Sequence, residues 1–157
     1  MKTYVLQVKT HKETQVLKQL KDLNLCGFAP SAIRLLRHRG QWQETTRPLI
    51  PGYVFIKTEL DTAQYYRVKR AAYVIQFIGN GAPVPLSEEE TAFIDLIANE
   101  EKPIPPFRME RNNVIDWMYL FGNKVIPIET NLRQRRIRLA LPLFGITHII
   151  TLSISLP

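Results

Sequence analysis

Cysteine is almost absent from this chain, since Cys26 is the single one among 157 residues. It cannot form an internal disulfide, and the three histidines add too few ligands in any zinc-binding pattern. These histidines also stand at no spacing from serine, cysteine or carboxylate that is typical of nucleophilic catalysis. The sequence therefore predicts no metal, no cofactor and no enzyme, and it favours a binding protein. We expect Cys26 to be a buried or half-buried structural thiol.

Long apolar runs and a phosphate-binding loop are missing as well. No stretch approaches the roughly 20 apolar residues of a membrane-spanning helix, and the first residues run into an alternating strand rather than a signal peptide. Gly79-Asn80-Gly81 is expected to be a turn, because it lacks the further glycine and the following helix of a phosphate loop. We therefore expect a cytoplasmic protein with no membrane partner.

Acidic residues are in deficit. The chain has 21 lysines and arginines against 14 acids, a formal charge of +7 and a sequence pI near 9.7. Such a balance favours an acidic partner, of which nucleic acid is the commonest, although a basic surface can also serve solubility alone. The hydrophobic content of 45% is ordinary for a soluble protein. The length allows one good core or two small ones.

The first hundred residues alternate between strand and helix patterns. Ser87 and Glu90 have the spacing of a capping box, which predicts that a helix begins there with Phe93, Ile94 and Ile97 turned inward. The expected elements are a strand at 3–9, a helix at 11–23, a hairpin at 28–46 turning at Arg39-Gly40, a strand at 53–56, a helix at 62–70, a strand at 73–78 and the helix from 87. This order predicts an α+β domain over residues 1–98 with a mostly antiparallel sheet.

The remaining third of the chain differs in kind. Residues 99–112 contain Pro103, Pro105 and Pro106 among charged residues, which predicts a linker. Residues 113–157 hold short apolar runs at 113–115, 124–128, 137–141, 146–150 and 151–156, a pattern that predicts a small all-β barrel. About 45 residues make a marginal core, so this domain is expected to depend on partners or on packing.

One segment around residue 50 combines a rigid turn with a strongly apolar strand. Pro48 and Pro51 lock their backbones, and Gly52 permits a conformation that side chains forbid. Tyr53 and Phe55 follow on one face of the predicted strand. By itself this pattern fits any turn before a buried strand.

Two basic clusters are candidates for nucleic-acid contacts. The first gathers toward the hairpin tip beside Trp42 and consists of Arg34, Arg37, His38 and Arg39. Guanidinium groups can neutralise phosphates and an exposed indole can stack on a base, so Arg37, Arg39 and Trp42 are the predicted DNA-contacting residues. The alternative is a solvated hairpin with Trp42 packed on its partner strand. The second cluster predicts an RNA-binding surface, with a solvated turn as the alternative; its members are Arg133, Arg135, Arg136 and Arg138.

Several segments resemble the NusG-type transcription elongation factors. The sequence from Pro48 to Ile56 is similar to the PLFPGYVF segment of the amino-terminal (NGN) domain in this family. The other matching segments are residues 4–10, the helix at 13–23, the hairpin tip at 39–42, and residues 83–90 before the last helix. Thr3 stands where the family usually has tryptophan, and His11 where it usually has glycine.

The C-terminal part resembles the KOW domain that follows the linker in this family. Leu143-Phe144-Gly145 matches a recurrent hairpin of that domain. The glycines usual in its first loop are replaced by Asp116, Leu120 and Asn123, which makes the general NusG factors a weaker match than specialised paralogues of the LoaP and RfaH kind.

The resemblance implies a partner and a role. In this family the amino-terminal domain docks on the clamp helices of bacterial RNA polymerase, and Pro51, Tyr53 and Phe55 match the clamp-contacting segment. A docked domain reaches the non-template DNA and suppresses pausing, while the C-terminal domain recruits nascent RNA or another factor. The resemblance thus implies a monomeric transcription elongation factor, a specialised processive antiterminator. The competing class is a stand-alone RNA-binding or translation-associated module.

Overall fold

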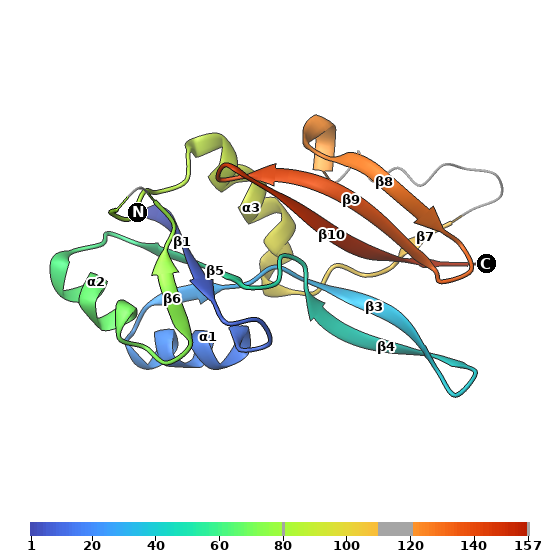
Figure 1. Ribbon diagram of the computed structural model, residues 1–157, viewed down its shortest axis with the longest axis horizontal. Coiled ribbons are helices and arrows are strands. Elements are labelled where there is room, and N and C mark those ends of the chain that lie inside the picture. The colour runs from blue at the N-terminus through green and yellow to red at the C-terminus, as the bar shows by residue number, and fades with distance from the viewer. Residues whose placement is uncertain (80, 110–120, 157) are drawn as a thin grey trace. The chain divides into compact units, whose positions relative to one another are not determined.

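The computed structural model describes residues 1–79, 81–109 and 121–156. Contacts divide the chain into two compact units (Figure 1): the first combines residues 1–29 and 51–92, and the second combines residues 30–50 and 93–157. The predicted hairpin thus belongs to the same unit as the C-terminal strands. The domain boundaries expected at 98 and 112 stay a prediction.

The described elements follow the expected order in the first hundred residues. They are β1 (Lys2–Val8), α1 (Glu13–Asp22), β2 (Cys26–Phe28), β3 (Ser31–His38), β4 (Gln41–Pro48), β5 (Tyr53–Thr58), α2 (Thr62–Lys69), β6 (Val74–Phe77) and α3 (Glu88–Ala98). Then come short 3-10 turns at Asn99–Glu101 and Gly122–Lys124 and the strands β7 (Phe107–Arg108), β8 (Ile126–Asn131), β9 (Arg136–Leu143) and β10 (Ile146–Ser155).

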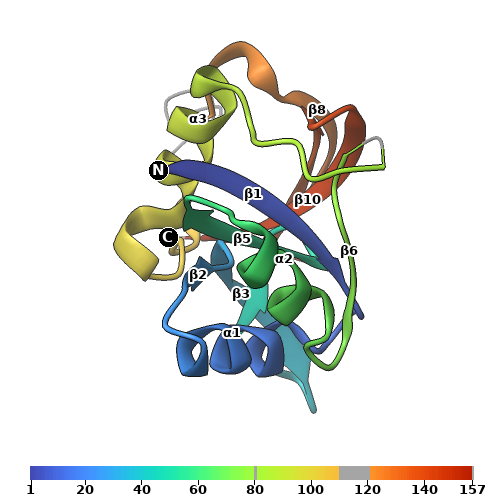
Figure 2. The ribbon, with the colours of Figure 1, turned by 90° about the vertical axis from the view of Figure 1, so that its left-hand side faces the viewer.

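The first unit is a four-stranded sheet in the order β2-β5-β1-β6, with antiparallel pairing throughout. Its core lies on one face, where Leu6 and Val54 of neighbouring strands meet Val16 and Leu20 of α1 and Val68 of α2. Both helices therefore cover the same face of the sheet (Figure 2). The alternation of strand residues leaves the side chains of Val5 and Phe55 on the opposite face.

Two helices of this part begin at a capping side chain. Asp61 accepts a hydrogen bond from the amide of Gln64 at 2.8 Å and starts α2. At α3, Ser87 Oγ accepts from the Glu90 amide at 3.1 Å, and Glu90 Oε1 accepts from the Ser87 amide at 3.3 Å. The capping box predicted from the sequence is thereby confirmed, and the three apolar residues expected to face inward from α3 are buried.

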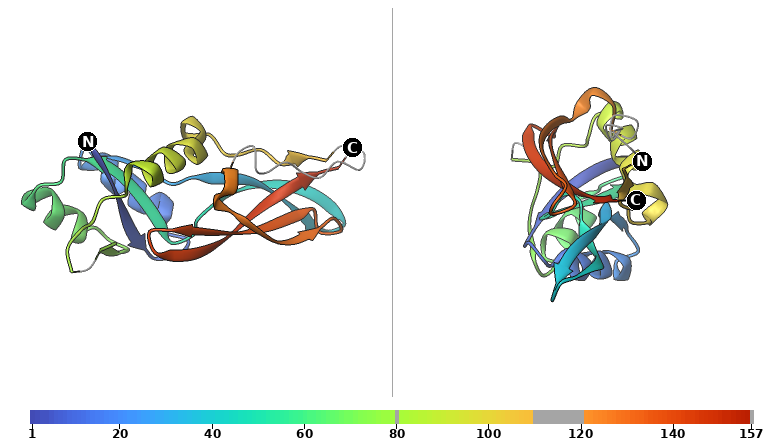
Figure 3. Two further views of the ribbon diagram at one scale, coloured as in Figure 1. Left: turned by 90° about the horizontal axis from the view of Figure 1, so that it is seen from above. Right: turned by 90° about the vertical axis from the view of Figure 1, so that its right-hand side faces the viewer.

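The second unit contains a hairpin and a sheet. The hairpin pairs β3 with β4 and turns at Arg39 and Gly40, as the sequence predicts. Both residues have positive φ. The sheet has the order β7-β10-β9-β8, with β7 yellow and the other three strands orange to red in Figures 1 and 3. Its strand β9 alternates strictly, with Ile137, Leu139 and Leu141 fully buried.

The structure corrects one detail of the expected C-terminal strands. The runs 146–150 and 151–156 are one continuous strand, β10, which pairs with β9 over residues 146–153. No glycine or proline separates the two runs, so nothing breaks the strand. Part of the expected linker also takes part in the fold: Ile104 is 4% exposed and exchanges backbone hydrogen bonds with β3. The expected strand at 113–115 lies outside the described residues.

The fold class is nevertheless the expected one, a mixed α+β chain with an N-terminal sheet and helices followed by a small β-rich part. Cys26 was expected to be at least half-buried, but its residue is exposed at the start of the edge strand β2. Over the ranges that the structure describes, none of the helices has the length and apolarity needed to cross a membrane.

Candidate binding surfaces

The turn before β5 is held by a buried carboxylate. Glu13, at the start of α1, is 5% exposed, and its Oε1 accepts hydrogen bonds from the amides of Gly52 at 3.0 Å and His11 at 3.2 Å. Gly52 has φ +86°, which a side chain would strain, and its carbonyl accepts from the Val8 amide at 2.9 Å. The turn that begins with exposed Pro51 is therefore rigidly tied to β1 and α1.

The two aromatic residues after this turn have different environments. Phe55 is fully buried and stacks on Phe28 with ring centroids 5.7 Å apart. Tyr53 is half-buried at the beginning of the same strand, opposite Gln7 of β1. Of the predicted polymerase-binding residues, Pro51 and Tyr53 are thus accessible in the structure, whereas the side chain of Phe55 is buried.

In the second unit, the edge of β3 that does not pair with β4 contacts the C-terminal sheet. The amide of Leu35 donates a 2.8 Å hydrogen bond to Ser153 Oγ of β10, a residue that is 1% exposed. Ser153 pairs directly with Arg136 of β9, so the two side chains lie on the same face of the sheet. This contact brings the hairpin to the face that carries the arginines of β9.

A pocket of 330 Å³ lies along this contact. Its wall includes arginines from the hairpin and from the β8–β9 region, and the indole of Trp42. We call it the arginine pocket and define it by Arg34, Arg37, Trp42, Arg133, Gln134 and Arg136. The two basic clusters that the sequence presents a hundred residues apart thus meet at one place.

The indole in this wall is fixed by a fifth arginine. The guanidinium carbon of Arg135 lies 4.5 Å from the centroid of Trp42, within cation–π range. Arg135 adopts a left-handed backbone with φ 52°, and its carbonyl accepts a hydrogen bond from Ile154 of β10. Asn131 shapes the same turn, because its Oδ1 accepts from the Gln134 amide at 2.9 Å.

Positive charge is concentrated in the pocket wall. The pKa of Arg34 is lowered by burial and by the nearby charges of Arg47, Arg136 and Arg138. Arg34 Nε is buried and lacks a hydrogen-bond partner within the described residues. Glu129 offsets part of this charge by accepting from Arg136 at 3.2 Å, and that hydrogen bond lowers its own pKa.

The structure assembles only part of each predicted cluster. Arg39 is exposed at the hairpin tip and does not line the pocket, and Arg138 of β9 is half-buried beside it. Arg34 belongs to the basic hairpin cluster of the sequence but is not among its predicted DNA-contacting residues, and the sequence does not indicate Gln134 at all. Arg34 and Arg37 are three positions apart, so their side chains point to opposite faces of β3. The strand pattern alone therefore does not show that both line one pocket at the edge of β3.

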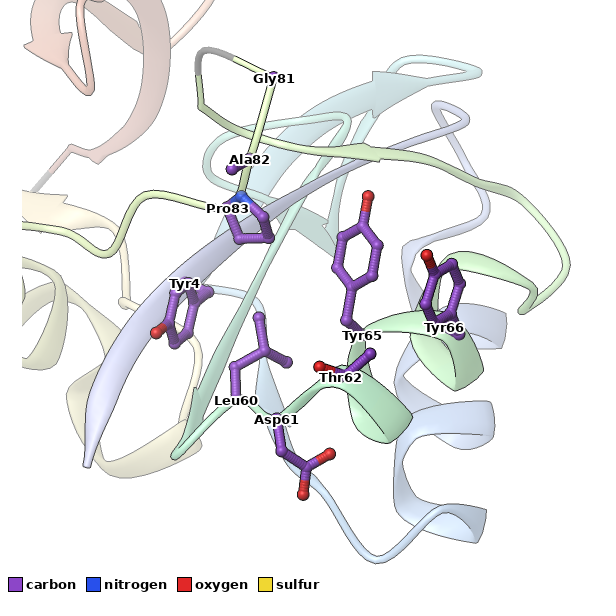
Figure 4. Close-up of a pocket in the computed structure, with 9 residues that line it drawn as sticks. All are labelled: Tyr4, Leu60, Asp61, Thr62, Tyr65, Tyr66, Gly81, Ala82 and Pro83. Atoms are coloured by element: carbon purple, nitrogen blue, oxygen red, sulfur yellow. The ribbon is translucent and has the colours of Figure 1, made fainter.

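A second pocket, of 480 Å³, belongs to the first unit (Figure 4). Tyr4, Tyr65, Tyr66 and Pro83 give it an aromatic and apolar wall. Its carboxylate, Asp61, already caps α2. The arrangement offers aromatic surface and hydroxyl groups and no pair of acid and base among its described lining residues.

Comparisons with known proteins identify relatives of this chain. The family model described as "Transcription termination factor nusG" matches residues 1–95. The NusG proteins of Helicobacter pylori strain 26695 and Chlamydia trachomatis are 34% and 33% identical over 105 and 110 residues, and each alignment covers 64% of this chain and 60% of the relative. The NusG protein of Pseudomonas aeruginosa is 31% identical over 158 residues, with 90% of this chain and 89% of the relative aligned.

A solved structure described as "Domain interaction in Thermotoga maritima NusG" has a similar fold. It aligns with 97% of this chain and 93% of its own at a TM-score of 0.57 and 19% identity. At that identity the likeness concerns the fold alone.

Proposed function

This chain belongs to the NusG family, and we propose that it acts as a bacterial transcription elongation factor that docks on the clamp helices of RNA polymerase. Within the family we assign it to the specialised processive antiterminators, because Asp116, Leu120 and Asn123 replace the usual KOW-loop glycines. It would work as a monomer in the bacterial cytoplasm. Relatives named transcription termination/antitermination protein support the role.

The observation that carries this proposal is the geometry of the turn before β5. Glu13 holds Gly52 from within the first unit, so exposed Pro51 and half-exposed Tyr53 are presented by a rigid backbone. A preorganised aromatic residue loses little entropy on binding, and such residues are frequent hot spots in interfaces. A strand that served the core alone would bury both Tyr53 and Phe55.

The test is binding of the purified chain to purified bacterial RNA polymerase. We expect Tyr53→Ala to weaken binding by about 2 kcal/mol or more, the typical cost of truncating a central aromatic anchor. Tyr66→Ala is the matched control, since Tyr66 is 49% exposed on α2 of the same unit. Unchanged affinity of a folded Tyr53→Ala variant would refute the clamp assignment.

We further propose that the exposed hairpin tip contacts the non-template DNA strand. Arg37 and Arg39 are exposed near the turn, and a solvated guanidinium is free to neutralise a phosphate. Replacing both with alanine should reduce crosslinking to the non-template strand in a transcription complex while polymerase affinity is largely kept. Equal crosslinking by the double variant would leave the hairpin a solvated structural element.

We propose nascent RNA as the ligand of Arg133, Arg135, Arg136 and Arg138. Their concentration near the β8–β9 turn supports this role, and it also favours the second candidate function, a stand-alone RNA-binding or translation-associated module. The polymerase-binding experiment separates the two functions. A chain that binds RNA and shows no affinity for polymerase belongs to the second class.

A further inference from the structure

We propose that the arginine pocket is one site that takes a single nucleotide of single-stranded nucleic acid, with the phosphate among the arginines and the base against Trp42. The hairpin and the β8–β9 region would then contribute to one site, at which a strand of DNA and a strand of RNA compete. This inference rests on the proposed function only in taking nucleic acid as the partner.

The first argument is charge. Four arginines line the pocket, and its described lining residues include no aspartate or glutamate. Arg34 is close enough to Arg47, Arg136 and Arg138 for their charges to repel its own, and its buried Nε has no hydrogen-bond partner in the described part of the chain. An anion entering here relieves the repulsion and supplies the missing acceptor, and Arg is the side chain best suited to bidentate phosphate contacts.

The backbone adds a donor on the same side. The amides of Ile33 and Leu35 donate away from β4, to Ile104 and to Ser153. In an antiparallel pair the outward amides alternate, so the N–H of Arg37, the next in this series, is directed to the same edge of β3. Proteins commonly bind the phosphate oxygens of nucleic acids through such main-chain N–H groups together with arginine side chains.

The second argument is the indole. Trp42 lines the pocket while Arg135 stacks over its ring at 4.5 Å, which holds the ring in place without filling the pocket. Leu35 and Leu36 add apolar surface to the same wall. Aromatic rings beside phosphate-binding groups are typical of proteins that bind single strands, because every unpaired base offers a face for stacking.

Size and shape select a single nucleotide. The volume of 330 Å³ lies at the lower end of the range for small-ligand sites, about 300–1,000 Å³. A duplex has its bases stacked and paired, so it would use only the charges and leave the indole and the leucines without a partner.

The experiment uses the full chain, without polymerase, and fluorescent single-stranded oligomers of ten uridines and ten thymidines. We expect the two oligomers to compete for binding with a stoichiometry of one, because they share the pocket. Simultaneous binding of both oligomers would overturn the proposal. So would the absence of binding by either oligomer at about 50 mM salt, where electrostatic contacts to phosphates are only weakly screened.

Charge variants locate the site. For single strands each lost phosphate contact should reduce the slope of log K against log salt by about 0.7, so Arg37→Gln/Arg133→Gln should reduce it by about 1.4. Arg67→Gln/Arg70→Gln removes two exposed charges at the end of α2 and should leave the slope nearly unchanged. An equal reduction in the two double variants would mean diffuse electrostatic binding and would overturn the proposal.

The indole variant tests the position of the base. Trp42→Ala should weaken binding of the normal oligomer by about 5- to 150-fold, the range for one base–aromatic stack, and leave an abasic oligomer unaffected. If Trp42→Ala unfolds the hairpin, Trp42→Leu replaces it as an apolar variant that cannot stack. Equal losses for normal and abasic oligomers would overturn the base contact.

These outcomes are independent of polymerase docking. Tyr53→Ala lies outside the pocket and should bind both oligomers like the wild type. A chain that loses polymerase affinity with this change but keeps competitive oligomer binding supports both proposals. A chain that binds oligomers and never polymerase supports the pocket alone.

Discussion

Adjacent residues of one motif perform different tasks in this protein. The segment from Pro51 to Phe55 looks uniform in the sequence, yet Phe55 is fully buried against Phe28 while Tyr53 stays half-exposed. A resemblance to a family assigns the same binding role to every residue of the segment. Only the packing of each side chain separates the residue that stabilises the turn from the one that is available to a partner.

Phe55→Ala should therefore act on stability. Truncating a buried phenylalanine typically costs about 3–5 kcal/mol because a cavity remains, and the Phe28 stack is lost with it. Tyr53→Ala, at a half-exposed position, should cost much less. Urea unfolding of the two variants measures the difference, and equal destabilisation would show that Tyr53 is also part of the core.

Glu13 offers a second test at this scale. Glu13→Ala leaves the buried Gly52 amide without its acceptor, which should destabilise the protein by about 1–3 kcal/mol. Glu13→Gln keeps an acceptor oxygen in place and should recover most of the loss. Thermal unfolding measures stability, and polymerase affinity should fall in the alanine variant, since the turn before Tyr53 is loosened. If Glu13→Ala unfolds like the wild type, the carboxylate does not hold the turn.

Whole elements were predicted better than single residues. Apolar periodicity located α1, the capping box located α3 and the glycine-containing turn located the hairpin, because local sequence determines where such elements begin and end. The break expected inside β10 was wrong, since two apolar runs of β-branched residues without an interrupting glycine or proline form one strand. The pairing of Ile104 with β3 was not predictable, because it depends on a contact between residues about 70 positions apart.

The turn between β8 and β9 determines where two arginines are held. The Asn131 side chain accepts from the Gln134 amide and mimics a backbone turn. Asn131→Ala should lower stability by about 1 kcal/mol, the typical worth of one such hydrogen bond, and should weaken oligomer binding although no charge is lost. Asn131→Asp keeps the acceptor and serves as the stability control. Wild-type stability and affinity in Asn131→Ala would mean that the turn is held by Arg135 and β10 alone.

At the scale of the molecule, the site combines segments that are distant in the sequence. The excess of basic residues predicts a nucleic-acid partner, and both clusters were visible as clusters. Their meeting within one compact unit was not, because it follows from β3 lying against β10. Arg34 lines the arginine pocket because of the same contact between β3 and β10. Composition thus indicates the class of ligand, whereas the tertiary contact determines the site.

The stability of the folded chain should also depend on pH through His148. This residue of β10 is 9% exposed, with its ring 4.8 Å from that of Phe144, and burial lowers its pKa below the ordinary value of 6.5. His148 binds a proton more readily in the unfolded chain than in the folded one. Its contribution to the free energy of unfolding is therefore fully present above pH 6.5 and is lost as the pH falls below that value. The slope of unfolding free energy from this group is at most about 1.4 kcal/mol per pH unit. Urea unfolding between pH 5 and 7.5 should show wild type losing more stability on acidification than His148→Gln, and parallel curves would contradict the assignment.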